Sequence, residues 1–173
     1  MTTNPPAAAR RPVSPRLWNM LGFLACLAGM MYALYAQYFL HLEPCPLCIF
    51  QRIALIALGA VFIIAALHDP QGWGSRVYAL LILLVAGAGA AIAARHAWLQ
   101  SLPPEQVPAC GPGLDYLWQN FPIADLLNTV LRGSGECAKI DWELFHLSMP
   151  WWTLFMFVGL GLAGFVRNLL GTR

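Results

Sequence analysis

Long apolar runs alternate with polar stretches along this chain. Four of the runs are long enough to cross about 30 Å of hydrocarbon as α-helices that rise about 1.5 Å per residue. The pattern predicts an all-α membrane protein in which a single domain folds as a four-transmembrane-helix bundle. The expected spans are residues 17–40, 49–67, 77–96 and 150–166.

The polar stretches differ in length, and the longest lies between the third and fourth spans. Within it, residues 114–121 and 123–131 carry apolar side chains at helical spacing but are too short to cross a membrane. They predict either a helix on the membrane surface or a small helix packed on the loop's own core. In chain order the polar stretches are 1–16, 41–48, 68–76, 97–149 and 167–173.

Composition supports the membrane interpretation. The chain has 173 residues, of which 59% are hydrophobic and 10% are charged, whereas a typical soluble domain is roughly 25% charged. The lipid bilayer is therefore an expected partner. The net charge of +2 is small and the basic residues are scattered along the chain, so we expect no nucleic-acid partner.

Basic residues gather on one side of the predicted bundle. Six of the ten Lys and Arg residues lie in the two terminal tails and in the connection 68–76. Cytoplasmic loops carry an excess of such residues, so both termini are expected to be cytoplasmic. Residues 41–48 and 97–149 then lie outside, which in a bacterium is the periplasm. The six residues are Arg10, Arg11, Arg16, Arg76, Arg167 and Arg173.

Four of the five cysteines fall in the two exterior segments. They are Cys45 and Cys48 in the first, and Cys110 and Cys137 in the second. An exterior compartment is oxidising and permits disulfides. The fifth, Cys26, lies halfway along the first span, where a cysteine behaves as a small apolar residue. We assign it no role.

A Cys-x-x-Cys pair stands where the second span begins. If the helix starts there, Cys48 lies in its first turn, where unpaired amide N–H groups and the positive end of the helix dipole favour a thiolate. Arg52 follows four residues later, on the same helix face. Cys48 is therefore the candidate reactive thiolate.

Cys-x-x-Cys alone fits half a zinc site, a redox pair or a chance spacing. A c-type haem is disfavoured, because Ile49 stands where that attachment needs His. A four-cysteine zinc site is disfavoured because 26 residues separate Cys110 from Cys137. An activated dithiol at the membrane edge, together with a second pair in sequence rich in Gly and Pro, favours a relay by thiol–disulfide exchange.

Two alternatives stay open at this point. The chain could be a structural membrane protein whose loop is pinned by one disulfide between Cys110 and Cys137, which would be ordinary in the periplasm. It could also be a relay that carries electrons outward from the cytoplasm. An outward relay would need cysteines accessible from inside, and Cys26 is the one candidate.

Several short motifs surround the cysteines. With the four spans, they make the chain resemble the DsbB family, the quinone-linked disulfide bond formation proteins of bacterial inner membranes. The resemblance covers nearly the whole chain. The motifs are CPLCIFQR at 45–52, RHAWLQ at 95–100, Cys110, GECA at 135–138, and Met149-Pro150-x-Trp152.

The resemblance implies a quinone-dependent thiol:disulfide oxidoreductase that uses ubiquinone or menaquinone from the membrane pool. Its soluble partner would be DsbA, a thioredoxin-fold protein of the periplasm. Reduced DsbA would attack a Cys110–Cys137 disulfide at Cys110. Freed Cys137 would attack Cys45, and Cys48 would be released to pass electrons to the quinone. A strongly oxidising partner such as DsbA needs a final acceptor more oxidising still.

The resemblance also implies which residues meet the quinone. They are Arg52, His96 and Met149, with Trp152 as a pocket wall that an aromatic belt at the interface would explain equally well. Arg95 points about 100° away from His96 on its helix and is expected to reach lipid headgroups. Gln51 stands where relatives can carry an acid.

Overall fold

The computed structural model describes residues 14–108, residues 132–170, and positions 119, 122, 125 and 128 between them. Its four long helices are each long and apolar enough to cross a membrane. The predicted fold class is therefore confirmed. Most of the segments 114–121 and 123–131, and Cys110, lie outside the described residues. The long helices are α1 (Pro15–Tyr38), α2 (Pro46–His68), α3 (Trp73–Gln100) and α6 (Met149–Leu170).

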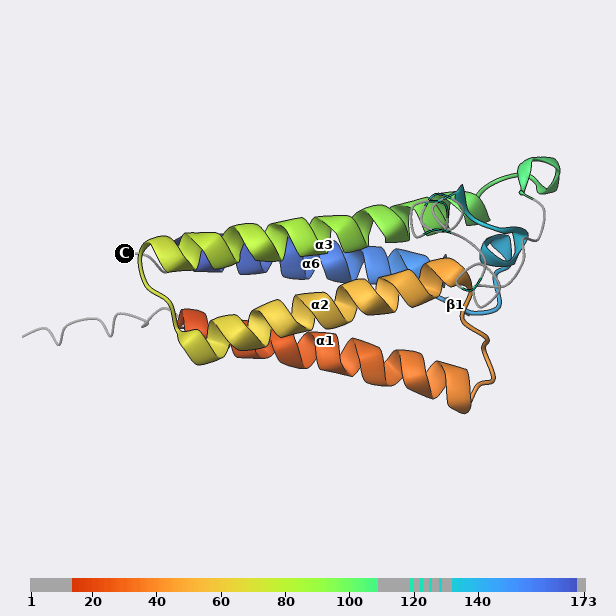
Figure 1. Cartoon of the computed structure of the whole chain (residues 1–173). Helices are drawn as coiled ribbons and strands as arrows, with labels where there is room; N and C mark the ends of the chain where they lie inside the picture. The colour runs from red at the N-terminus through yellow and green to blue at the C-terminus, as the bar shows by residue number, and fades with distance from the viewer. Residues whose placement is uncertain are drawn as a thin grey trace, which may run out of the picture.

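The helices pack as two antiparallel pairs. Helix α1 lies along α2, α3 lies along α6, and α2 also packs on α3 (Figure 1). The start of α1, the end of α6 and the short link between α2 and α3 share one end of the bundle, which we call the terminal end. The connection from α1 to α2 and the segments before α6 share the other end, which we call the loop end.

Helix α3 is longer than the apolar span expected at 77–96. It begins at Trp73, directly after Gly72, whose φ of 60° lies in the left-handed region that glycine adopts readily. It continues without a break to Gln100, and Ser101 ends it. The apolar pattern predicts only the part of a helix that faces lipid, whereas the helix itself extends to the residue at which a turn begins. At the loop end, the extra turn extends the helix beyond His96 and adds Gln100 to it.

Small residues let the helices approach closely. A Cβ atom built on Gly89 of α3 would lie 2.5 Å from the ring of Phe157 on α6, well inside van der Waals contact. Phe157 is fully buried in the main core, which also contains Phe62 of α2 and Ile82 of α3. The Gly- and Ala-rich run 86–91 thus lets α6 approach closely.

A buried polar clamp ties the terminal end together. The Asn19 and Asn168 side chains, each 1% exposed, donate to each other's Oδ1 atoms over 3.1 and 2.9 Å. The Ser75 hydroxyl donates to the carbonyl of Asn168 over 2.6 Å. Hydrocarbon offers no water to such groups, so they must satisfy one another. The clamp joins α1, α3 and α6.

Short elements cover the loop end. Two 3-10 turns, η1 (Pro104–Gln106) and η2 (Gly135–Ala138), are followed by a hairpin of β1 (Glu143–Leu144) and β2 (Leu147–Ser148). The two strands pair antiparallel, and Phe145 and His146 between them have positive φ angles of 53° and 61°. Strands of two residues have no alternation to detect, so the hydrophobic pattern did not predict this hairpin.

Candidate functional site

The Cys-x-x-Cys pair forms the start of α2. Cys45 is the N-cap and Pro46 is the first helical residue, a position where proline loses no hydrogen bond. The amide N–H of Cys48 donates to the Sγ of Cys45 over 3.4 Å, and the Cys45 thiol lies 3.1 Å from the Sγ of Cys48. Cys48 is therefore in the first turn, as predicted. The sulfur that caps the helix is that of Cys45, which the sequence argument missed although a residue before an N1 proline is a natural cap.

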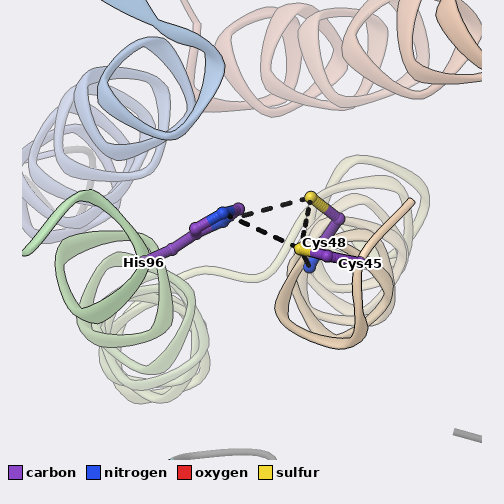
Figure 2. A group of neighbouring side chains, drawn as sticks. All are labelled: Cys45, Cys48 and His96. Atoms are coloured by element: carbon purple, nitrogen blue, oxygen red, sulfur yellow. Dashed lines mark hydrogen bonds between the residues drawn. The ribbon is translucent and has the colours of Figure 1, made fainter. Parts of the chain in front are cut away.

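His96 reaches the two sulfurs from α3. Its Nε2 lies 3.7 Å from the Sγ of Cys45 and its Nδ1 lies 4.0 Å from the Sγ of Cys48. Figure 2 shows the ring extending across the gap between the helices toward both cysteines. The side chain is only 3% exposed. The resemblance implied that His96 meets the quinone, and the structure brings His96 against the dithiol itself.

Gln51 holds the histidine ring in place. Its Nε2 lies 3.0 Å from the Nδ1 of His96, and the Gln51 side chain is 6% exposed. An amide can donate through nitrogen or accept through oxygen, so it can bond this ring nitrogen in either neutral tautomer. Gln51 was noted in the sequence only as a change from an acid. Its spacing of three residues from Cys48, on the same helix face, was the available signal.

Cys137 joins this cluster from the loop. It lies in η2, is fully buried, and packs with Leu47 and Leu99. Its sulfur is hydrogen-bonded to the Cys45 thiol. The structure therefore brings together three of the four predicted redox cysteines. The fourth, Cys110, lies outside the described residues.

Hydrogen bonding shifts the pKa values of Cys45 and Cys137 in opposite directions. The bond from Cys45, aided by bonds from Leu47 and Ser134, lowers the pKa of Cys137 to about 5 although burial acts in the opposite direction. The pKa of Cys45 is raised, first by its hydrogen bond to Cys137, then by that to Cys48 and by burial. A hydrogen bond that stabilises one sulfur as the anion keeps the donor thiol protonated. Cys45 thus holds its proton, and Cys137 favours the thiolate.

Arg52 is held against α1. Its guanidinium donates to the Oε1 of Gln37 and, over 3.0 Å, to the carbonyl of Ala33. The i+4 spacing does place it on the side of α2 that carries Cys48, because both residues line the same cavity. A charge near hydrocarbon needs partners, and the polar groups of α1 provide them.

Two cavities meet at Cys48. The larger, of about 200 Å³, lies among α1, α2 and α6, and Arg52 and Met149 are on its wall with Cys48 and Trp152. The smaller, of about 80 Å³, is lined by Cys45, Cys48, His96 and Met149, among others. The structure therefore places the predicted quinone-contacting residues in two groups: Arg52 and Met149 on the larger cavity, and His96 and Met149 on the smaller.

The end of α3 fastens the segment that carries Cys137. The guanidinium of Arg95 donates to the carbonyl of Arg132 over 2.9 Å and lies 4.2 Å from the ring centre of Trp98. The Gln100 side chain donates to the carbonyl of Lys139 over 3.2 Å and accepts from the hydroxyl of Ser148. Arg95 was expected to reach lipid headgroups. It instead donates to a carbonyl of the loop that follows α3.

Comparison with known proteins decides the family. The family model described as "Disulfide bond formation protein DsbB" matches residues 15–166. The chain belongs to the DsbB family. The predicted resemblance is therefore confirmed. The matched region contains α1, α2, α3, α6 up to residue 166, and the cysteines at 45, 48, 110 and 137.

Curated relatives carry the same name. "Disulfide bond formation protein B" of Methylococcus capsulatus is 54% identical over 148 residues, which cover 86% of this chain and 90% of the relative. Its counterpart in Nitrosococcus oceani is 52% identical over 149 residues, covering 86% and 88%. That of Hahella chejuensis is 52% identical over 139 residues, covering 80% and 84%. This DsbB-family chain is a multi-pass membrane protein of a disulfide-forming family.

Proposed function

We propose that this chain is a quinone-dependent thiol:disulfide oxidoreductase of the bacterial inner membrane that reoxidises a DsbA-like periplasmic protein. The observation that carries the proposal is a row of three sulfurs that ends at a cavity. Cys137 contacts Cys45, Cys45 contacts Cys48, and Cys48 lines the larger cavity. Such a row suits the transfer of a disulfide by successive thiolate attacks.

The first exchange joins the protein to its soluble partner. A thiolate of the reduced partner attacks Cys110 of a Cys110–Cys137 disulfide, that S–S bond breaks, and Cys137 leaves as a thiolate. The partner's second thiolate then displaces Cys110, so the partner departs with its own disulfide. Family membership supports the role of Cys110. The lowered pKa of Cys137 supports the direction, because a thiol of low pKa leaves faster.

The second exchange moves the disulfide toward the membrane. The Cys137 thiolate attacks Cys45 of a Cys45–Cys48 disulfide, a Cys45–Cys137 bond forms, and Cys48 leaves as a thiolate. The contact between the Cys137 and Cys45 sulfurs supports this step. Cys48 and Cys110 then hold the two electrons taken from the partner. The Cys110 thiolate then attacks Cys137, so the Cys110–Cys137 bond forms, the Cys45–Cys137 bond breaks and Cys45 leaves. The reduced Cys45–Cys48 pair now holds the two electrons, and its oxidation restores the second disulfide.

The larger cavity suits a quinone head. Its wall is mostly apolar, with Met149, Pro150 and Trp152 among its residues. Arg52 and Glu43 are the charged residues of the wall, and Cys48 contributes a sulfur. Few polar groups in an apolar pocket are typical of small-molecule sites. A quinone held there would supply a two-electron, two-proton acceptor. Cys48 delivers the electrons to this cavity, and Arg52 supplies a fixed positive charge and N–H donors.

The orientation follows from charge and fold together. We place both termini in the cytoplasm, because the basic residues gather in the tails and in the link 68–76. The ends of α1 and α6 and that link share the terminal end, and the thiol cluster lies at the loop end. The redox cysteines are then periplasmic, where the soluble partner is. An outward relay is disfavoured, because Cys26 is 3% exposed in the core.

The test is turnover with defined electron donors and acceptors. Purified protein in lipid nanodiscs is mixed with a reduced DsbA-like protein and ubiquinone or menaquinone, and quinol formation is followed by absorbance. We expect one quinol per partner disulfide formed. When Cys137→Ser is mixed with the oxidised partner instead, the Cys110 thiolate attacks the partner's disulfide, one partner thiol leaves, and the mixed disulfide through Cys110 accumulates. A Cys26→Ala variant should behave as the parent. Partner oxidation that proceeds without Cys48, or a trapped complex through Cys48, would overturn the proposal.

A further inference from the structure

The dithiol and the histidine together form a set of metal ligands. One ligand atom from each of Cys45, Cys48 and His96 can be chosen so that all three lie within 4.8 Å of one another, and they converge from two helices (Figure 2). We propose that the reduced protein binds one Zn²⁺ ion at these three residues, and that the bound ion blocks disulfide exchange. Binding requires neither a quinone nor a partner protein.

The separations suit tetrahedral zinc. Zinc bonds of about 2.3 Å to sulfur and about 2.0 Å to nitrogen put tetrahedral ligand atoms roughly 3.5 to 3.8 Å apart. The Sγ of Cys45 and the Nε2 of His96 are already 3.7 Å apart. The two sulfurs, 3.1 Å apart, must separate by about 0.6 Å to reach the zinc spacing. A small side-chain rotation of Cys45 or Cys48 supplies that change.

The donor set and its surroundings favour zinc over harder cations. Two thiolates and one neutral imidazole are ligands that zinc prefers, and their two negative charges neutralise the ion in a buried position. Gln51 supports the histidine ring on the side away from Cys45. Its amide Nε2 lies 3.0 Å from the Nδ1 of His96; a flip of the amide by about 180° brings Oε1 to that position, where it accepts the Nδ1 proton and leaves Nε2 of the ring facing Cys45. Metal-bound histidines are commonly oriented in this way.

The smaller cavity gives the ion a path and a place for a fourth ligand. All three ligand residues line its wall, together with Glu136, Lys139 and Asp141. Two of these side chains are acidic, which favours the approach of a cation. The fourth position is left to water, as in zinc sites that have three protein ligands. Cys137 stays outside the set, because the group whose ligand atoms all lie within 4.8 Å of one another consists of Cys45, Cys48 and His96.

The cysteine spacing disfavoured a zinc site made of four cysteines, whereas the proposed site has two cysteines and one histidine. The third ligand here is a histidine on another helix, 48 residues beyond Cys48, so no local motif contains it. Metal binding also depends on the redox state of Cys45 and Cys48. When Cys45 and Cys48 form a disulfide, neither sulfur can bind the metal as a thiolate. Zinc therefore selects the reduced dithiol, and its sulfurs are then unavailable for attack.

The experiment uses full-length protein in nanodiscs, stripped of quinone, with Cys110→Ser and Cys137→Ser so that only the site dithiol and Cys26 remain. After anaerobic reduction, Zn²⁺ is titrated in competition with a chromophoric chelator, and Co²⁺ serves as the spectroscopic probe. We expect one ion per chain and the thiolate-to-cobalt absorption of a tetrahedral site. Prior oxidation to the disulfide should abolish both.

Variants assign the ligands. Cys45→Ser or Cys48→Ser should abolish binding, and His96→Gln should weaken it at least about 10-fold and shift the cobalt spectrum. Gln51→Leu, which removes only the support behind the ring, should weaken it roughly 10- to 100-fold. The matched controls are His68→Gln, which changes a histidine bonded to Tyr78 in the second turn of α3, and Cys26→Ala. Neither should change affinity.

Alkylation of the parent protein gives a second measurement that needs no variant. Zn²⁺ should protect Cys45 and Cys48 of the reduced protein from alkylation, and a chelator should restore the reaction. Equal zinc affinity in the His96→Gln variant and the parent would overturn the three-ligand site. So would a lack of protection, or stoichiometric binding by the oxidised protein. Because quinone and partner are absent, these outcomes are independent of the proposed turnover.

Discussion

Replacing Arg52 by methionine isolates the charge beside Cys48. Methionine keeps an unbranched stem of similar reach but cannot donate to Gln37 or Ala33. Loss of two bonds between α1 and α2, at about 0.6 kcal/mol each within a membrane, costs roughly 1 kcal/mol. The bundle should therefore still fold, because its main core around Phe62 and Phe157 is untouched.

The effect on turnover should be larger than the effect on the fold. A hydrogen bond from a charged group contributes about 1.5 to 3 kcal/mol, which corresponds to a roughly 10- to 150-fold loss in kcat/KM for quinone. Quinol formation is measured at saturating reduced partner, with quinone varied. The partner exchange at Cys110 is measured separately by trapping in a Cys137→Ser background, and it should be unchanged in Arg52→Met.

A matched variant separates charge from general damage. Arg76→Met removes a charge near the start of α3, at the terminal end of the bundle, and should leave quinone kinetics within about twofold, since surface changes have small effects. If Arg52→Met also left quinone turnover unchanged, Arg52 would serve only to tie α2 to α1. If Arg52→Met abolished partner exchange as well, the assignment of partner exchange to the cysteines and of quinone reduction to the larger cavity would be wrong.

Three further predictions concern packing, the clamp and topology. Gly89→Leu should destabilise the bundle by about 1 to 3 kcal/mol, because the larger side chain overpacks on Phe157. The loss of stability is measured by steric trapping in bicelles. Gly87→Leu should not destabilise the bundle, because a Cβ atom at Gly87 meets no atom within 4 Å. Asn168→Leu should cost roughly 1 to 2 kcal/mol in the same assay while leaving quinone reduction intact; an inactive but stable variant would contradict a purely structural clamp. A membrane-impermeant thiol reagent added outside intact cells should label reduced Cys45, and labelling only after lysis would reverse the orientation.

Much of the architecture follows from the sequence, because it depends on local patterns. A span is an apolar run long enough to cross hydrocarbon, so the four helices can be found one at a time. The start of α2 is equally local: Pro46 suits a first helical position and thereby makes Cys45 the cap. The placement of Arg52 on the side of Cys48 needs only the period of the helix.

The contacts of the site depend instead on how the helices pack. His96 and Gln51 are 45 residues apart along the chain yet share a hydrogen bond, and Cys137 reaches Cys45 because Gln100 and Arg95 bind the loop's carbonyls. Hydropathy records which side chains prefer lipid, but it says nothing about the rotation of one helix against the next. That rotation is set by how small residues such as Gly89 admit large ones such as Phe157. Tertiary packing therefore decides which side chains meet the two sulfurs.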